Sequence, residues 1–482
     1  MKKALSMLLP LLLVLGLAAC DREQPAVTTA PSAETTADPN ALSIPLTADF
    51  GGYEFHTLTA GNYAVEDFAA EEESEIVLDN AQYKRKRKVE QDYNVKILQD
   101  TEVSRSYGTG PGYMEVIKQV NAGDTTYDLC LIAGYDVSAL AYTGNLYDMA
   151  SAPGIDLTKP WWDQNAIRSL AVKDVVFFTT GEITVSDNTA AFCMLFNKDI
   201  LSRYGLPSPY ETVYKGEWTI ENFAKLARSV SEDLDQDGKF TPSDLFGVLI
   251  WDDTIVGMVN AAGQRCCTIN ESGEIELTLY NETTLSALEQ FANIAYDKQH
   301  ALQFSRYSVS EKPLWRNNQS LLYTGLVKNI PEFRDMESDF GILPYPKLTA
   351  EQENHYTTIA PWHSQFICLP LVQEDIERTG VLVEALAYYG KEVVLPAFYD
   401  ITLVGQASRD EESEGMLDII FGNLIYDIGY YYQIGSYNEG LINQLRAYST
   451  DFASMYDKSR SKAEAKLALI NEFYSEAVAE WQ

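Results

Sequence analysis

Four aspartates within twelve residues form the sharpest chemical motif in the chain. The segment Asp233–Asp244 reads DLDQDGKFTPSD, with Asp at positions 1, 3, 5 and 12 and Gly at position 6. Carboxylates at this spacing, a sharp turn at the glycine and a backbone carbonyl at position 7 are the ligands of a calcium loop. The predicted ligands are Asp233, Asp235, Asp237, the Lys239 carbonyl and Asp244. Position 12 is usually Glu, and the shorter Asp244 side chain weakens the case for bidentate ligation there.

The alternative for this segment is a solvated acidic turn. Four crowded carboxylates repel one another without a cation, which favours calcium. The pattern predicts a helix over Thr219–Glu232, with Thr219 as N-cap, and a strand over Phe246–Trp251. A helix entering the loop and a strand leaving it would make half an EF-hand. We expect the ion to have a structural role, joining that helix to that strand.

A polar insert, Ser186–Asn188, separates two apolar segments, Phe177–Val185 and Ala190–Phe196. Short apolar runs rich in Val and Phe are typical of buried strands. Polar side chains between buried strands need partners, because burying them unpaired is costly. The insert is therefore either a tight turn or a crossover between two lobes, at which polar side chains face a cleft.

Other chemical motifs are missing from the sequence. The four histidines have no metal-ligand spacing, and the chain has no GxSxG nucleophile motif. The glycine-rich segment Ser104–Gly112 lacks the Lys-Ser/Thr pair of a phosphate loop, so we interpret it as a mobile loop. A glycosidase needs only two carboxylates across a cleft, and the 70 acidic residues leave that chemistry open.

The N-terminus has the pattern of a secretory signal. Two lysines precede a short apolar run that ends in Leu17-Ala18-Ala19-Cys20. This ending resembles a bacterial lipoprotein box, which implies lipidation of Cys20; an ordinary signal with a chance cysteine is the alternative. Residues 21–45 are poor in apolar bulk and predict a flexible tether with a reach of roughly 25–30 Å. We expect a signal peptide over 1–19, a lipidated cysteine and tether over 20–45, and a location on the outer face of the membrane or in the periplasm.

Composition narrows the remaining chain. Residues 46–482 exceed one ordinary core and suit two lobes. The net charge of −34 argues against nucleic acid and anionic lipid as partners, and favours neutral or cationic ligands. The basic run Lys84–Lys88 lies in a predicted helix, Ala81–Tyr93, and we expect it to form a solvated face. The five cysteines after Cys20 have no spacing that indicates a disulfide framework or a zinc site.

Alternating strands and helices predict the α/β class. A strand over Val95–Leu98, a helix over Tyr113–Ala122 and a buried strand over Tyr127–Ala133 form a βαβ unit. Tyr135 and Asp136 follow that strand, where ligands bind in open α/β sheets. Other predicted helices are Lys159–Val172, Thr284–Asp297, Met416–Tyr432 and Glu439–Trp481. Of the adjacent Trp161 and Trp162 in the first of these, we expect at least one in the core.

Several motifs occur in a characteristic order along the chain. They are Lys159–Asp163 (KPWWD), Leu195–Asp199 (LFNKD), Gly216–Thr219 (GEWT), Asp339–Lys347 (DFGILPYPK), and Arg409–Ser413 (RDEES) followed by Met416–Phe421 (MLDIIF). In these stretches the chain resembles the family-1, sugar-binding class of extracellular solute-binding lipoproteins of bacterial ABC importers.

The resemblance implies the two-lobed, maltose-binding-protein-like (type II periplasmic) fold with a helical C-terminus. It implies crossings near Ser186–Asn188, Ile359–Trp362 and Ile401–Arg409. Lobe 1 is then expected over 46–186 and 360–408, and lobe 2 over 187–359 and 409–482. A hinge between the lobes would close when the ligand contacts both of them.

The resemblance also implies a monomer that captures a solute, expected to be an oligosaccharide, and delivers it to ABC permease subunits without catalysis. A surface glycan-docking protein without transport is the main alternative, and a glycoside hydrolase is a weaker one. Candidate ligand contacts lie beside strand ends and crossovers, with packing as the competing explanation for each: Tyr135, Asp136, Asp187, Asn188, Trp251, Asp252, Trp362 and His363. Analogy with the maltose-binding layout adds Tyr323–Gly325 and Tyr430–Tyr432.

Overall fold

The computed structural model describes residues 40–61, 70–304, 310–403 and 411–481. The chain divides into two units, Met1–Ala41 and Leu42–Gln482. The predicted signal peptide, Cys20 and most of the predicted tether lie outside the described residues. Everything below concerns the second unit.

The first sheet has five strands in the order β2-β1-β3-β13-β4. Strand β1 pairs in parallel with both β2 and β3, whereas β13 runs antiparallel to β3 and β4. Every residue of β3 is buried, as its continuous apolar sequence predicts. The strands are β1 (Tyr53–Ala60), β2 (Val95–Glu102), β3 (Leu129–Ala133), β4 (Phe178–Thr179) and β13 (Gln365–Cys368).

The second sheet also has five strands, in the order β11-β5-β10-β6-β9. Strand β10 is central, antiparallel to β5 and parallel to β6. Its strands are β5 (Phe192–Asn197), β6 (Phe246–Trp251), β9 (Ala301–Phe304), β10 (Ser320–Leu326) and β11 (Phe340–Leu343). Two small sheets pair β7 (Cys267–Ile269) with β8 (Ile275–Leu277), and β12 (Thr357–Thr358) with β14 (Leu424–Ile425). Two mixed sheets with helices confirm the predicted two-lobed α/β class.

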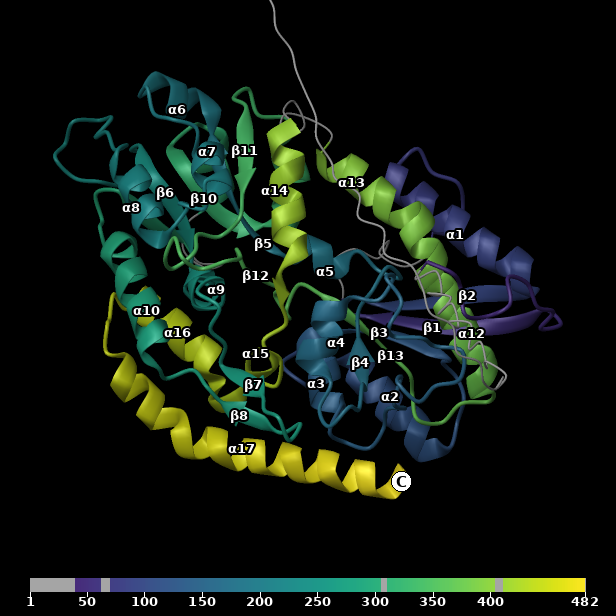
Figure 1. Cartoon of the computed structure of the whole chain (residues 1–482). Coiled ribbons are helices and arrows are strands. Elements are labelled where there is room, and N and C mark those ends of the chain that lie inside the picture. Colours follow the sequence, from purple (N-terminus) through teal and green to yellow (C-terminus); the bar gives the residue numbers. More distant parts are fainter. Residues whose placement is uncertain (1–39, 62–69, 305–309, 404–410, 482) are drawn as a thin grey trace, which may run out of the picture. The chain divides into compact units, whose positions relative to one another are not determined.

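Helices cover both sheets (Figure 1). Helix α1 packs on α12 in the first lobe, and α8 packs on α10 in the second. Around the first sheet and its crossovers lie α1 (Val77–Tyr93), α2 (Pro111–Ala122), α3 (Gly134–Leu140), α4 (Gln164–Leu170), α5 (Ser186–Thr189), α12 (Ile376–Tyr389), η4 (Gly390–Val394) and α13 (Leu395–Leu403). The other helices are α6 (Lys198–Arg203), α7 (Pro209–Tyr214), α8 (Ile220–Arg228), α9 (Thr254–Ala261), α10 (Glu282–Ala295), α11 (Glu311–Arg316), η2 (Val327–Asn329), η3 (Pro331–Phe333), α14 (Glu411–Gly422), α15 (Ile428–Tyr431), η6 (Ile434–Ser436), α16 (Tyr437–Arg446) and α17 (Phe452–Trp481).

Local signals set several helix ends. Thr219 caps α8 by accepting a hydrogen bond from the Asn222 amide, as predicted. Helix α2 ends at Gly123, whose φ of +66° suits a residue without Cβ. Among the described residues, none of the helices combines the length and the apolar character that crossing a bilayer requires.

The chain passes between the sheets at the predicted polar insert. Strand β4 belongs to the first sheet and β5 to the second, and the short helix α5 joins them. The chain returns between β11 and β13. The two connections are bonded to each other: the Gln365 amide donates to Ser186 Oγ at 2.9 Å, and the Ala360 amide donates to the Ala190 carbonyl at 3.1 Å. Most of the third expected crossing, Ile401–Arg409, lies outside the described residues.

Three expectations about local structure were wrong. The apolar run Phe177–Val185 contributes only the two residues of β4 to a sheet. The predicted helix Met416–Tyr432 is divided by β14, because Leu424 and Ile425 pair with β12. The predicted helix Lys159–Val172 is shorter and begins only at Gln164, after Trp161 and Trp162, which are both buried.

The basic run on α1 is not a uniformly solvated face. Arg85 is fully buried and donates from Nη1 to the Ile183 carbonyl at 2.5 Å. Lys86 is also buried, whereas Lys84, Arg87 and Lys88 are exposed as expected. Burial lowers the pKa of the Arg85 guanidinium to about 9. Arg85 is therefore buried by packing against the segment before α5, although the sequence pattern predicted a solvated face.

Candidate functional site

Aromatic rings from distant segments surround a cavity of about 220 Å³, which we call the acidic pocket. Tyr107 and Trp362 stack with ring centroids 4.7 Å apart, and Tyr135 lies 5.1 Å from Tyr107. Tyr430 packs edge-on against Tyr135. The lining residues are Tyr107, Tyr135, Trp251, Asp252, Asp253, Trp362, His363, Tyr430, Asn438, Glu439, Ile442 and Arg446.

Close backbone contact places Trp362 at this pocket. The Gly134 amide, at the end of β3, donates to the Pro361 and Ser364 carbonyls at 3.1 Å each. A Cβ at Gly134 would lie 2.8 Å from the Pro361 oxygen, so the contact requires glycine. The returning connection is thereby held against the end of β3, beside Tyr135.

Asp136 organises the loop that carries Tyr107. Its carboxylate accepts hydrogen bonds from the amides of Ser106, Gly108 and Gly110 at 2.9–3.0 Å. The side chain is buried and does not line the pocket. Asp136 therefore acts on the pocket through the loop, and its carboxylate is already occupied by protein donors. These bonds attach the glycine-rich segment, which the sequence predicts to be a mobile loop, to the start of α3.

The opposite side of the acidic pocket carries charge. Arg446 Nε donates to Asp252 Oδ2 at 2.8 Å, and Nη1 donates to Glu439 Oε1 at 3.3 Å. Although burial acts to lower it, the pKa of Arg446 is raised overall by the Asp252 carboxylate. Asp253 accepts a hydrogen bond from the Tyr430 hydroxyl at 3.3 Å. Burial raises the pKa of Asp253, and the charge of Asp252 raises it further.

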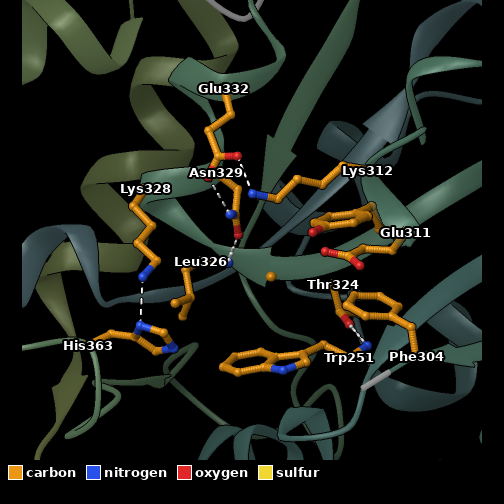
Figure 2. A pocket seen from close by; sticks show the side chains of 12 residues that line it. Trp251, Phe304, Glu311, Lys312, Thr324, Leu326, Lys328, Asn329, Glu332 and His363 are labelled. Atoms are coloured by element: carbon orange, nitrogen blue, oxygen red, sulfur yellow. Dashed lines mark hydrogen bonds and ion pairs between the residues drawn. The ribbon is translucent and has the colours of Figure 1, made fainter. Parts of the chain in front are cut away.

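A second cavity of about 460 Å³ lies in the second lobe, and we call it the mixed pocket (Figure 2). Lys312 pairs with Glu332, and Lys328 Nζ lies 2.6 Å from His363 Nδ1. In Figure 2 the Trp251 ring lies across the pocket from the Lys312–Glu332 pair. The lining residues are Trp251, Phe304, Glu311, Lys312, Tyr323, Thr324, Gly325, Leu326, Lys328, Asn329, Glu332 and His363.

The two pockets share Trp251 and His363. The rings of these residues lie 6.1 Å apart in an edge-on arrangement. The Trp251 amide donates to Thr324 Oγ1 at 2.8 Å, which fixes the end of β6 against the central strand β10. One indole therefore borders both pockets, and a ligand with several rings could occupy them together.

Five of the eight predicted contact residues line these pockets: Tyr135, Trp251, Asp252, Trp362 and His363. The analogy with maltose-binding proteins added Tyr430, which lines the acidic pocket, and Tyr323–Gly325, which line the mixed one. Tyr431 and Tyr432 are buried in the core. Asp136, Asp187 and Asn188 line neither pocket.

Asp187 lies inside the crossover. It accepts hydrogen bonds from Thr180 Oγ1 and from the Asn188 amide, both at 2.9 Å. Burial and, secondly, the charge of the nearby Asp163 raise the pKa of Asp187 to about 7. The Asp187 carboxylate therefore has its hydrogen-bond donors within the crossover. The sequence had predicted that the side chains of the polar insert face a cleft.

Sequence reasoning missed Tyr107, Asp253, Asn438, Glu439 and Arg446 at the acidic pocket. Asp253 adjoins the predicted Asp252 and could have been included. Glu439 and Arg446 belong to one helix, α16, and their seven-residue spacing puts them on one face. Nothing in the sequence indicates which sheet that face approaches.

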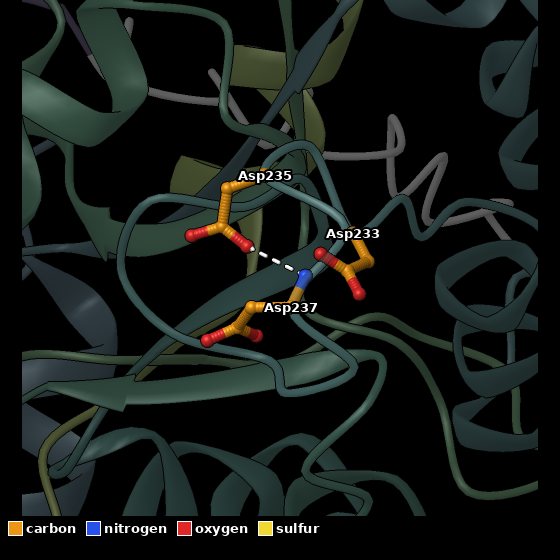
Figure 3. A group of neighbouring side chains, drawn as sticks. All are labelled: Asp233, Asp235 and Asp237. Atoms are coloured by element: carbon orange, nitrogen blue, oxygen red, sulfur yellow. Dashed lines mark hydrogen bonds between the residues drawn. The ribbon is translucent and has the colours of Figure 1, made fainter.

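Three predicted calcium ligands converge (Figure 3). The carboxylates of Asp233, Asp235 and Asp237 each offer an oxygen within 4.8 Å of the others. Gly238, with φ of +81°, makes the predicted turn, and its amide donates to Asp233 Oδ2 at 2.8 Å. Asp233 Oδ1 is shielded from solvent and accepts no hydrogen bond from the described residues. Such an oxygen set suits a hard cation.

Two parts of the calcium-loop expectation need correction. Helix α8 ends at Arg228, so a helix does not lead directly into Asp233. A backbone pairing between Glu232 and Leu245 closes the loop instead. Asp244 accepts hydrogen bonds from the Leu234 amide at 2.9 Å and the Thr241 amide at 2.7 Å. The Thr241 amide, above all, lowers the pKa of Asp244. Asp244 thus stabilises the loop through hydrogen bonds to two of the loop's own backbone amides.

Of the comparisons with known proteins, only the comparison with solved structures finds matches. No family model matches the chain, and no curated protein matches it. Solved structures do match, over nearly their whole length.

The ABC substrate-binding protein Lmo0181 of Listeria monocytogenes, in complex with cycloalternan, has a TM-score of 0.53 at 14% identity, over 88% of this chain and 99% of its own. The galacto-N-biose-/lacto-N-biose I-binding protein of a Bifidobacterium longum ABC transporter has a TM-score of 0.56 at 10% identity, over 87% and 98%. A family 1 extracellular solute-binding protein of Bifidobacterium longum subsp. infantis has a TM-score of 0.53 at 12% identity, over 88% and 100%. The fold is therefore that of the solute-binding proteins of ABC transporters, which confirms the fold expected from the sequence motifs.

Proposed function

We propose that this protein captures an oligosaccharide at the combined acidic and mixed pockets and delivers it to an ABC permease. The observation that carries the proposal is that the two pockets adjoin at Trp251 and His363, on a fold used for solute binding. Aromatic faces pack on the C–H surfaces of sugars, and the polar groups around them accept and donate hydrogen bonds to hydroxyls. Solved relatives of this fold were determined with cycloalternan and with lacto-N-biose.

Binding without catalysis is part of the proposal. At the acidic pocket Asp252 is held by Arg446, and at the mixed pocket Glu332 is held by Lys312. The pockets also contain Asp253 and Glu311, and a glycosidase needs two carboxyl groups across the scissile bond. The solved structures with this fold are solute-binding proteins, which favours binding alone. A bound oligosaccharide should therefore stay intact on prolonged incubation, as judged by mass spectrometry.

A thermal-shift screen against a panel of glycans tests the proposal. A ligand at 100 times its Kd should add about 2.7 kcal/mol to the free energy of unfolding. The Trp251→Ala variant, which removes the ring shared by both pockets, should lose the shift for every hit. A panel without hits, or hits that shift this variant as much as the wild type, would contradict capture at these pockets.

The location of the protein rests on its first residues. We propose that Cys20 is lipidated after removal of residues 1–19, and that residues 21–45 tether the binding unit to the outer face of the membrane. The Cys20→Ala variant should then appear in the soluble extracellular or periplasmic fraction. Recovery of the variant in the membrane fraction would contradict the anchor.

We propose further that the loop 233–244 holds a structural calcium ion. The supporting features are the convergence of Asp233, Asp235 and Asp237, and the shielded Asp233 oxygen that accepts no hydrogen bond from the described residues. The Lys239 carbonyl, at position 7, would complete the protein ligands with water. Asp244 would then support the loop through its bonds to the Leu234 and Thr241 amides, in place of the direct contact expected from the sequence.

A further inference from the structure

The charged groups at the acidic pocket do not balance. Its lining contains three carboxylates, those of Asp252, Asp253 and Glu439, and one guanidinium, that of Arg446. The remaining lining side chains are aromatic, amide, aliphatic or imidazole groups. With the carboxylates ionised and His363 neutral, the lining carries a net negative charge; the nearest cations behind it are Lys328, which contacts His363, and Arg105, which lies over the Trp362 ring.

Arg446 is committed to two of these carboxylates. Nε and Nη2 both contact Asp252 Oδ2, and Nη1 contacts Glu439 Oε1 and Asn443 Oδ1 at 3.3 Å each. The Asp252 side chain is almost fully buried, so it needs this cation. One guanidinium thus serves three carboxylates, because it contacts Asp252 and Glu439 directly and acts on Asp253 only through space.

Asp253 faces polar and acidic neighbours from several elements. The Tyr430 hydroxyl of α15 donates to Oδ2, Asp252 precedes it in the chain, and Glu439 and Arg446 lie on α16. The charge of Asp253 also acts on Tyr135 of α3 and on Tyr345. Of these groups only Arg446 is cationic. Burial and, secondly, the charge of Asp252 raise the pKa of Asp253, so a cation beside it would favour its ionised form.

We propose, given that the protein captures saccharides, that the acidic pocket takes a sugar unit that carries a protonated amine. The ammonium group would lie between the aromatic walls and the carboxylates of Asp253 and Glu439. A cation near the faces of Tyr and Trp rings gains cation–π attraction, and a cation near Asp253 compensates a buried charge. A neutral sugar unit could hydrogen-bond to the carboxylates but would leave the excess charge uncompensated.

The test compares glucosamine oligomers with N-acetylglucosamine oligomers of equal length, which share a backbone and differ in whether the nitrogen of each sugar unit is a charged amine or a neutral amide. Calorimetry near neutral pH should show the amine form binding at least about tenfold tighter, the scale expected for one close charge pair. Asp253→Asn should remove most of that preference. Asp124→Asn, an exposed aspartate outside both pockets, is the matched control and should keep it.

Proton linkage gives a second readout. Because the amine needs ionised Asp253, the affinity of the glucosamine oligomer should fall as the pH is lowered through the raised pKa, with proton release on binding. Asp253→Asn should flatten this dependence. Equal or tighter binding of the N-acetylated form, or an unchanged preference in Asp253→Asn, overturns the inference while capture of saccharides stands. A glycan panel without any hit overturns both.

Discussion

The indole of Trp362 stacks on the phenol ring of Tyr107, with their centroids 4.7 Å apart. Trp362 lies on the returning connection, and Tyr107 lies on the loop held by Asp136. This pair forms one wall of the acidic pocket. Its geometry therefore depends on the position of the returning connection and on the position of the loop that Asp136 holds.

The Trp362→Ala variant should bind the captured glycan about 1–3 kcal/mol more weakly, the range for an aromatic anchor in a binding site. Titration calorimetry with the best hit of the glycan screen measures the loss. Tyr214→Ala, which removes an exposed aromatic ring outside both pockets, is the control and should bind normally. Unchanged affinity in a folded Trp362→Ala variant would remove this residue from the site.

Removal of calcium should lower the melting temperature of the wild-type protein. A calcium ion present at 100 times its Kd adds about 2.7 kcal/mol to the stability of the folded state. Differential scanning calorimetry with and without chelator measures the effect. Asp235→Ala should abolish the difference, and Asp457→Ala, which changes an exposed aspartate on α17, should retain it. Identical wild-type curves in metal-stripped buffer with and without added calcium would rule out the site.

Asp187 should make the protein less stable as the pH rises. Its pKa is about 7 in the folded protein because of burial and, secondly, the charge of Asp163, against an unfolded value of about 3.9. The folded state therefore binds the proton more tightly, and the stabilisation is lost as the pH rises between these two values.

The Asp187→Asn variant should accordingly be more stable than wild type at about pH 8, by at least about 1 kcal/mol, and gain little near pH 4. Urea denaturation at both pH values measures this. The Asn188 amide keeps its acceptor in the variant, and the Thr180 hydroxyl can rotate to accept from the new amide. A loss of stability equal at both pH values would show that Asp187 is ionised and stabilising in the folded protein.

Arg85 should contribute far more to stability than its neighbours in the basic run. Replacing it with Ala removes the donor to the Ile183 carbonyl and leaves a cavity at a fully buried position. We expect a loss of about 2–4 kcal/mol in the free energy of unfolding. Lys84→Ala, on the exposed face of the same helix, should change it by no more than about 0.5 kcal/mol. Similar values for the two variants would contradict the burial of Arg85.

Local sequence signals predicted much of the fold. Strand β6 has the predicted bounds, Phe246–Trp251. Thr219 caps the start of α8 and Gly123 caps the end of α2, as their residue types predict. The five cysteines of the described residues are buried, as the apolar runs around three of them predict. These features depend on contacts between near neighbours in the chain.

The site could be predicted only where it borders a strand end or a connection. Tyr135 follows β3, Trp251 ends β6, and Trp362 lies on the returning connection, so each carried a positional signal. Tyr107 lies in a loop with no such signal, and Arg446 lies near the C-terminal end of an amphipathic helix. Their places at the pocket depend on Asp136 and Asp252, which are distant in sequence.

The sequence by itself determined the α/β class, the order of most elements, the acidic loop and the point at which the chain leaves the first sheet. Periodicity, capping residues and turn residues encode these features locally. The tertiary structure decided which charged residues are buried. Arg and Asp side chains are mostly exposed to solvent, but Arg85 and Asp187 are buried here. It also decided the composition of the pockets, because the free energy of a side chain's position depends on what the rest of the fold brings against it.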